Sequence, residues 1–152
     1  IAAATGPATA SPTPSEGTLR SVCAYLDQRR LLTTELYVVK PTYQRVQIRA
    51  EIVASDDADL GEVQQQVEQS LLDYFHPLKG GEDGLGWPFG GTIYYSRVTQ
   101  RCFTIPGVAS VTSLVIVLDG EEIPPCTDVT INEAGLLYAT EHQIDVSYRF
   151  ES

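Results

Sequence analysis

The chain has 152 residues, 43% of them hydrophobic and 20% charged, which suits one globular domain with its own core and leaves too little length for two. Its 20 acidic and 10 basic residues give a formal net charge of −10, a sign that repels phosphate backbones and argues against nucleic acid as a partner. No apolar stretch approaches the roughly 20 residues of a membrane-spanning helix, so we expect no direct insertion into a membrane.

Residues 1–14 are rich in Ala, Thr, Pro and Ser and show no periodicity, which predicts a flexible linker or lead-in. They have neither the basic region nor the apolar core of a signal peptide. The sequence starts at Ile1 and not at a methionine. We therefore expect a fragment of a longer protein, in which residues 15–152 form a single domain.

The first ordered element is predicted to be a helix over residues 16–29, with Ser15 as its N-cap, because apolar residues recur on one face at helical spacing. Two strands are predicted next, a short one at 36–39 and a long one at 46–52. In the long strand, apolar side chains alternate with polar ones. This pattern is typical of a sheet that helices cover on one face only.

The clearest helix is predicted over residues 60–75, where apolar residues form one stripe and Pro77 ends the pattern. It is followed by the segment HPLKGGEDGLGWPFGG, residues 76–91, which holds six of the twelve glycines and the only tryptophan of the chain. A further helix is predicted over 93–104, because apolar residues recur there at intervals of four.

The last third of the chain is rich in strand signals. Strands are predicted at 111–118, 136–139 and 144–150, and Asp119-Gly120 forms a turn after the first of them. The order of elements predicts an α+β fold, with a mixed or antiparallel sheet, two to three helices packed on it and a long glycine-rich loop.

Two interpretations of the glycine-rich segment stay open. In the first, it folds over a small molecule or a sugar, since glycine-rich turns can present backbone N–H groups to a ligand. A phosphate cradle is disfavoured, because the segment follows a helix, lacks the P-loop pattern and carries two acidic residues. In the second, favoured interpretation, it is a rigid loop whose Trp87, Pro88 and Phe89 insert into a hollow or pack against a neighbouring subunit.

Nothing in the sequence predicts catalysis, a metal site or a cofactor. His76 is expected to interact with a helix dipole, and His142 is expected to be exposed at the start of a strand. The acidic residues at 56–59 lack the other ligands of a calcium-binding loop and are interpreted as a helix-capping cluster. The cysteines show no CxxC pattern and are expected to be free thiols: Cys23, Cys102 and Cys126.

Four stretches of the chain together resemble the C-terminal domain of the baseplate J-like proteins of contractile phage tails and phage-tail-like injection systems: 29–43, 71–98, 105–111 and 126–148. The most specific part is a helix that ends in Phe-His-Pro-Leu and is followed by Gly-Gly and Gly-Trp-Pro-Phe-Gly. The positions that match this signature are candidates for a subunit interface or for anchoring of the loop: His76, Pro77, Gly80, Gly81, Gly84, Gly86, Trp87, Pro88, Phe89, Gly90, Pro106 and Gly107.

The resemblance implies a structural role without catalysis. Such a protein is a wedge component that joins neighbouring wedges into a ring around the hub, at the base of the sheath. The implied partners are other wedge proteins, neighbouring copies or a paralogue, and baseplate proteins next to the hub and the sheath. Assembly would take place in the cytoplasm, and the product would be a virion or a phage-tail-like particle. Proteins of this family are usually longer, and Arg97 stands where an acidic residue is expected.

Overall fold

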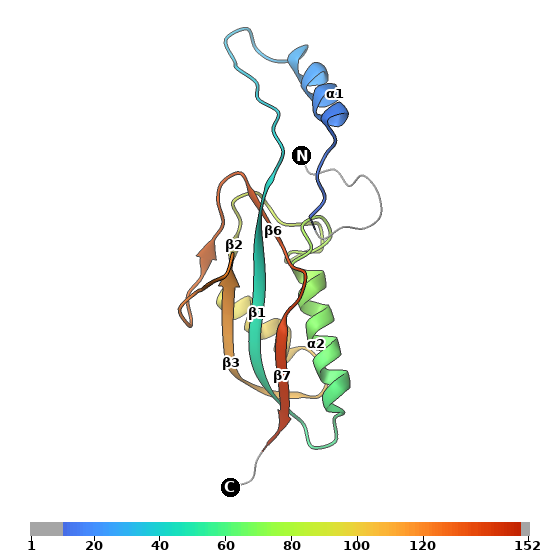
Figure 1. Ribbon diagram of the computed structural model, residues 1–152, viewed down its shortest axis with the longest axis vertical. Helices are drawn as coiled ribbons and strands as arrows, with labels where there is room; N and C mark the ends of the chain where they lie inside the picture. Colours follow the sequence, from blue (N-terminus) through green and yellow to red (C-terminus); the bar gives the residue numbers. More distant parts are fainter. Residues whose placement is uncertain (1–10, 150–152) are drawn as a thin grey trace.

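The computed structural model describes residues 11–149 and confirms the α+β class (Figure 1). The described part contains three helices and seven strands. In chain order these are α1 (Glu16–Asp27), β1 (Thr42–Ala54), α2 (Leu60–Tyr74), β2 (Thr92–Ile93), α3 (Tyr95–Phe103), β3 (Val108–Leu118), β4 (Glu121–Glu122), β5 (Val129–Thr130), β6 (Gly135–Tyr138) and β7 (Gln143–Tyr148).

The long strand β1 is the centre of a mixed sheet. On one side it pairs with β3 in antiparallel orientation, and the short β4 continues the sheet beyond β3. On its other side β1 pairs with β6 and then with β7, both parallel to it. The strands β2 and β5 form a separate two-stranded ribbon.

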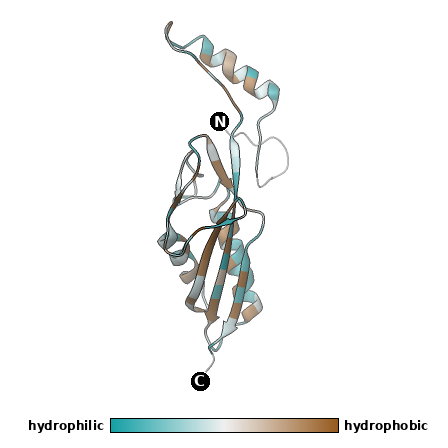
Figure 2. Ribbon diagram, turned by 60° about the vertical axis from the view of Figure 1, so that its left-hand side comes forward, coloured by the Kyte–Doolittle hydropathy of each residue, from teal (hydrophilic) through white to brown (hydrophobic). Residues whose placement is uncertain are grey.

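The core lies between one face of this sheet and the helices α2 and α3. Alternate residues of β1 are buried from Val46 to Ala54, whereas the residues between them are exposed or half-buried. The helices contribute their apolar stripes to the same core, which is also visible as the brown inner strands of Figure 2. The predicted one-sided covering of the sheet is therefore confirmed.

A one-residue insertion separates β6 from β7. Arg45 is the last β1 residue opposite β6, and Arg49 is the first opposite β7. Between these two positions, three residues of β1 lie opposite the four residues that connect β6 to β7. The side chain of His142 fills the gap, and its Nδ1 accepts a hydrogen bond of 2.9 Å from the backbone N–H of Ile48. The expectation of an exposed His142 is wrong, since this residue is only 7% exposed and substitutes for a backbone acceptor in the ladder.

Residues 15–41 form an arm that extends away from the body of the domain (Figures 1 and 2). It consists of α1 and of an extended segment that returns along the helix to the start of β1. The predicted apolar face of α1 is half-buried against that segment, but no residue of this helix is fully buried. The arm therefore contributes little to the core of the domain.

Several sequence predictions differ from the structure at the ends of elements. Residues 36–39 are extended but form no strand, because no other described segment pairs with them. The two-residue strands β2, β4 and β5 were not predicted, since so short a segment carries no periodicity. The strand predicted at 144–150 runs from Gln143 to Tyr148, and its predicted last residue lies outside the described part.

Candidate functional site

The glycine-rich loop, residues 76–91, begins as the C-terminal cap of α2. The N–H of Gly80 donates to the carbonyl of His76 and the N–H of Gly81 to that of Tyr74, each over 2.8 Å. Gly81 has a positive φ of 83°. At Gly80, a Cβ atom would lie less than 3.0 Å from three backbone carbonyl oxygens, so no side chain fits this turn. Both glycines are thus required by the way the helix ends.

Trp87 closes the loop onto the core. It is 8% exposed, stacks on Phe75 with ring centroids 5.8 Å apart, and meets the ring of Tyr74 edge-on. Its Nε1–H donates a 2.7 Å hydrogen bond to the carbonyl of Tyr74, and its backbone N–H donates to the carbonyl of Pro77. The side chain is therefore an anchor within its own domain, with its polar atom satisfied.

A polar cluster ties the loop to α3. Glu82 accepts a 2.6 Å hydrogen bond from the hydroxyl of Tyr74 and forms an ion pair of 3.3 Å with Arg97. The guanidinium of Arg101 lies over the Tyr74 ring, 4.3 Å from its centroid. Burial, together with the bond to Glu82, raises the pKa of the Tyr74 hydroxyl far above its usual range, so this group stays protonated and donates. Arg97 thus has a partner inside the domain.

The backbone N–H groups of the loop are largely used within the chain. Gly86 donates to Gly80, Gly90 to Gly135 and Gly91 to Pro88, over 2.8 to 3.2 Å. A phosphate or carboxylate cradle needs several N–H groups that converge on open space. Gly86 and Gly91 thus donate within the loop and Gly90 donates to β6, so these N–H groups hold the loop in its conformation.

His76 caps the loop turn. Its Nδ1 accepts hydrogen bonds of 3.2 Å from the backbone N–H groups of Leu78 and Lys79. Burial and the positive charge of Lys79 lower the pKa of His76, which favours the neutral ring that this acceptor role requires. The geometry gives His76 the role of a neutral acceptor, whereas an interaction with the helix dipole would require a charged ring.

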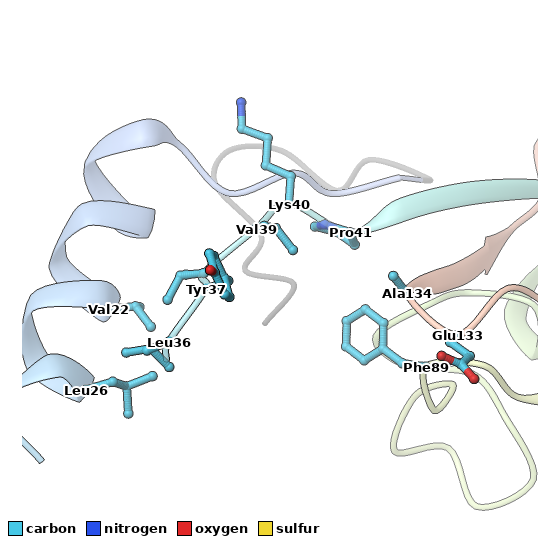
Figure 3. Close-up of a pocket in the computed structure, with 11 residues that line it drawn as sticks. Val22, Leu26, Leu36, Tyr37, Val39, Lys40, Pro41, Phe89, Glu133 and Ala134 are labelled. Carbon is cyan, nitrogen blue, oxygen red and sulfur yellow. The ribbon is translucent and has the colours of Figure 1, made fainter. Parts of the chain in front are cut away.

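The outer side of the loop is apolar and exposed. Leu85 at the tip is 83% exposed and Phe89 is 46% exposed. Phe89 also faces a groove of about 280 Å³ between the loop and the arm, which Val22, Leu26 and Leu36 line from the opposite side (Figure 3). Trp87 and Phe89, two residues apart, therefore belong to different environments.

The structure does not bring all predicted site residues together. Those from His76 to Gly90 lie in the loop, whereas Pro106 and Gly107 lie beside the β1–α2 connection, where the Gly107 carbonyl accepts from the N–H of Ser55. A Cβ atom at Gly107 would lie 2.9 Å from Val63, so this glycine permits close packing of α2. Asp59 caps α2 by accepting from the N–H of Glu62, as expected for the acidic residues there.

Sequence reasoning missed the exposed apolar residues of the arm. Leu31, Leu32, Tyr37 and Val39 are between 66% and 101% exposed, although residues 36–39 were predicted to form a strand. Within residues 11–149, no cluster of three or more metal-ligating side chains is present, and no helix is both long and apolar enough to span a bilayer.

Comparison with known proteins found a matching family and a similar structure. Residues 46–132 match the family model described as the Baseplate J-like protein C-terminal domain. A chain in the cryo-EM structure of the anti-feeding prophage (AFP) baseplate, 6-fold symmetrised, is similar to this one with a TM-score of 0.59 and 23% sequence identity. The similarity covers 84% of this chain and 26% of that chain, so the present sequence spans about a quarter of its length. No curated protein matches.

The family match includes α2, the glycine-rich loop and α3, and leaves out the arm. It covers more than half of the 152 residues. The chain belongs to the Baseplate J-like protein C-terminal domain family.

Proposed function

We propose that the chain is a structural component of the baseplate of a contractile, phage-tail-like particle. In that particle it acts as a wedge protein that joins its neighbours into a ring around the hub, at the base of the sheath, and it performs no catalysis. The observation that carries the proposal is the family match over residues 46–132. The similarity in fold to a chain of the AFP baseplate agrees with it.

The geometry of the loop supports a structural role. Its polar groups satisfy one another, as in the contacts of Glu82 and His76. Its exposed residues, Leu85 and Phe89, are apolar. Exposed apolar side chains on a rigid support are suited to contact with another protein.

The partners follow from this role. They are other wedge proteins, neighbouring copies of the chain or a paralogue, and baseplate proteins close to the hub and the sheath. Assembly takes place in the cytoplasm of the producing cell, and the finished particle is a virion or an injection device. The alternative, a module that binds a small molecule or a carbohydrate, is less well supported, because the loop uses its backbone donors internally.

Electron microscopy of particles purified through a tag on this protein tests the proposal. The expected result is sheathed tubes that carry the tag at one end only. A matched pair of variants, Phe89→Ala and Ser96→Ala, then asks whether the exposed aromatic ring contributes to assembly, since both positions are exposed but only the first is apolar. Particles that assemble in full without the tagged chain would refute the proposal.

A further inference from the structure

The arm ends in an extended segment that lacks a strand partner. Within the described part of the chain, no backbone–backbone hydrogen bond involves residues 35–41. The sequence Glu-Leu-Tyr-Val-Val-Lys, residues 35–40, is rich in residues that favour strands. Leu36 and Val38 are half-buried, whereas Tyr37 and Val39 are 78% and 66% exposed. Such a segment presents both of its edges for pairing.

Charge separates the arm from the body of the domain. Residues 15–41 carry four basic and three acidic side chains, whereas residues 42–149 carry six basic and sixteen acidic ones. The acidic bodies of two copies, residues 42–149 of each, therefore repel each other. A contact between copies is therefore electrostatically favoured where the arm of one copy meets an acidic surface of the other. The most one-sided surface includes residues 50–78, which contain seven acidic residues and no Lys or Arg.

This acidic surface borders a free sheet edge. Residues 50–78 include the end of β1 and all of α2, and β7 lies next to both. Within the described residues, β7 pairs with β1 only. The helix α2 lies beside β7, and its Gln64 side chain donates a 2.9 Å hydrogen bond to the carbonyl of Ile144. Asp145 of β7 is exposed. The other long edge strand, β3, contains no charged residue, so charge favours the β7 edge.

The arm cannot reach β7 of its own chain. Lys40 is followed at once by Pro41 and β1, and β7 begins opposite Arg49, nine residues further along the strand. At the rise of a β-strand this is about 30 Å, in the direction away from the arm (Figure 1). A strand added to β7 must therefore come from another molecule.

We propose that residues 35–40 of one copy add as an edge strand to β7 of a second copy, with Lys40 on the same face of the sheet as Asp145. In this arrangement Tyr37 and Val39 lie on the face of Ile144 and Val146, against apolar side chains. Lys40 has only a loose ion pair with the exposed Glu16, at 3.9 Å, in the isolated chain.

Because the arm and β7 lie at opposite ends of the domain, the contact is head-to-tail and propagates from copy to copy. It rests on the proposed function, since it assigns the surfaces through which copies join in the ring. The arm lies outside the residues matched by the family model.

Crosslinking in purified particles tests the contact. The full-length protein carries Cys23→Ser and Cys126→Ser, and Lys40→Cys is combined with Ser147→Cys on β7, which lies on the same face as Asp145, or, as a matched control, with Ser113→Cys on β3. All three of these introduced positions are exposed. A short bismaleimide is expected to join two copies in the β7 combination and not in the β3 combination. The absence of a crosslink through β7, or the capture of a different protein by residue 40, would overturn the proposal.

A charge exchange supplies the energetic test. Lys40→Glu and Asp145→Lys, each alone, are expected to lower incorporation of the tagged protein by about fivefold in competition with the unaltered protein. The double variant restores it. Failure of the double variant to recover would contradict the pairing of these surfaces. If the unaltered tagged protein is absent from particles, the proposed function fails; if it is present without the crosslink, only the strand addition fails.

Discussion

Replacing Trp87 with alanine is expected to destabilise the domain itself. The side chain is 8% exposed, stacks on Phe75 and donates from Nε1 to the carbonyl of Tyr74. Removal of a buried large aromatic side chain typically costs about 3–5 kcal/mol, through lost apolar burial and the cavity that remains. The free energy of unfolding of a domain is about 5–15 kcal/mol, so this loss is a large part of the total.

Urea denaturation followed by circular dichroism measures the effect, since Trp87 is the only tryptophan and its fluorescence disappears with it. With a urea dependence of about 2 kcal/mol per M, the midpoint of Trp87→Ala is expected about 2 M lower. Phe89→Ala is the matched control, because its ring is 46% exposed, and its midpoint is expected to change little. Equal shifts for the two variants would refute the assignment of Trp87 to the core.

Trp87→Phe separates packing from hydrogen bonding. It keeps an aromatic ring beside Phe75 and removes the Nε1–H donor. The Tyr74 carbonyl retains the hydrogen bond from Gly81, so the loss is expected to be about 1 kcal/mol in addition to the reduced ring area. A loss as large as that of the alanine variant would show that the hydrogen bond, and not the packing, holds the loop.

Three further outcomes are expected. Gly84→Ala is expected to cost about 1 kcal/mol, because Gly84 has a positive φ. Gly86→Ala should destabilise the domain at least twice as much, because Gly86 also has a positive φ and a Cβ atom there would lie 2.9 Å from a backbone carbonyl oxygen. The urea midpoints of the two variants measure the difference. Burial lowers the pKa of His142 to about 4, so the unfolded chain binds the extra proton first, and this group should lower the free energy of unfolding by up to about 3 kcal/mol between pH 6.5 and 4. His142→Leu should remove this contribution and leave the smaller slope that comes from His76, whose pKa is also lowered. Burial raises the pKa of the Cys102 thiol to about 11, so a thiol reagent should label Cys126 in the folded protein and Cys102 only in denaturant.

Elements with a long apolar period could be predicted from the sequence. The helix α2 and the strand β1 repeat their apolar residues over several turns or pleats, and the structure buries those residues against each other. Periodicity reports which side of a segment is buried, and it does so without knowledge of the partner.

Features that depend on a distant partner could not be predicted in this way. The segment 36–39 has the composition of a strand, but pairing decides whether it becomes one, and no described segment pairs with it. His142 was misjudged for the same reason. Its burial results from a mismatch of one residue between β1 and the two parallel segments β6 and β7, and this mismatch exists only after the sheet has formed.

The candidate site was predicted in part. The glycine-rich loop was recognised, with its positive φ angles at Gly81, Gly84, Gly86 and Gly90. The sequence could not tell which of Trp87 and Phe89 faces the core, since both are large and aromatic and they are separated by a single proline. Trp87 faces the core because it stacks on Phe75 and donates a hydrogen bond to the carbonyl of Tyr74, both at the end of α2.

The residues that make the loop recognisable are mainly those that the domain needs in order to fold. Gly80 and Gly86 have no room for a side chain, and Trp87 fills the core. A signature of this kind identifies the fold and carries little information about the partner. Because Trp87→Ala lowers the amount of folded protein, it would also lower assembly without any contact being lost. Experiments on partners therefore have to alter the exposed residues, such as Phe89 and those of the arm, in protein whose stability has been shown to be unchanged.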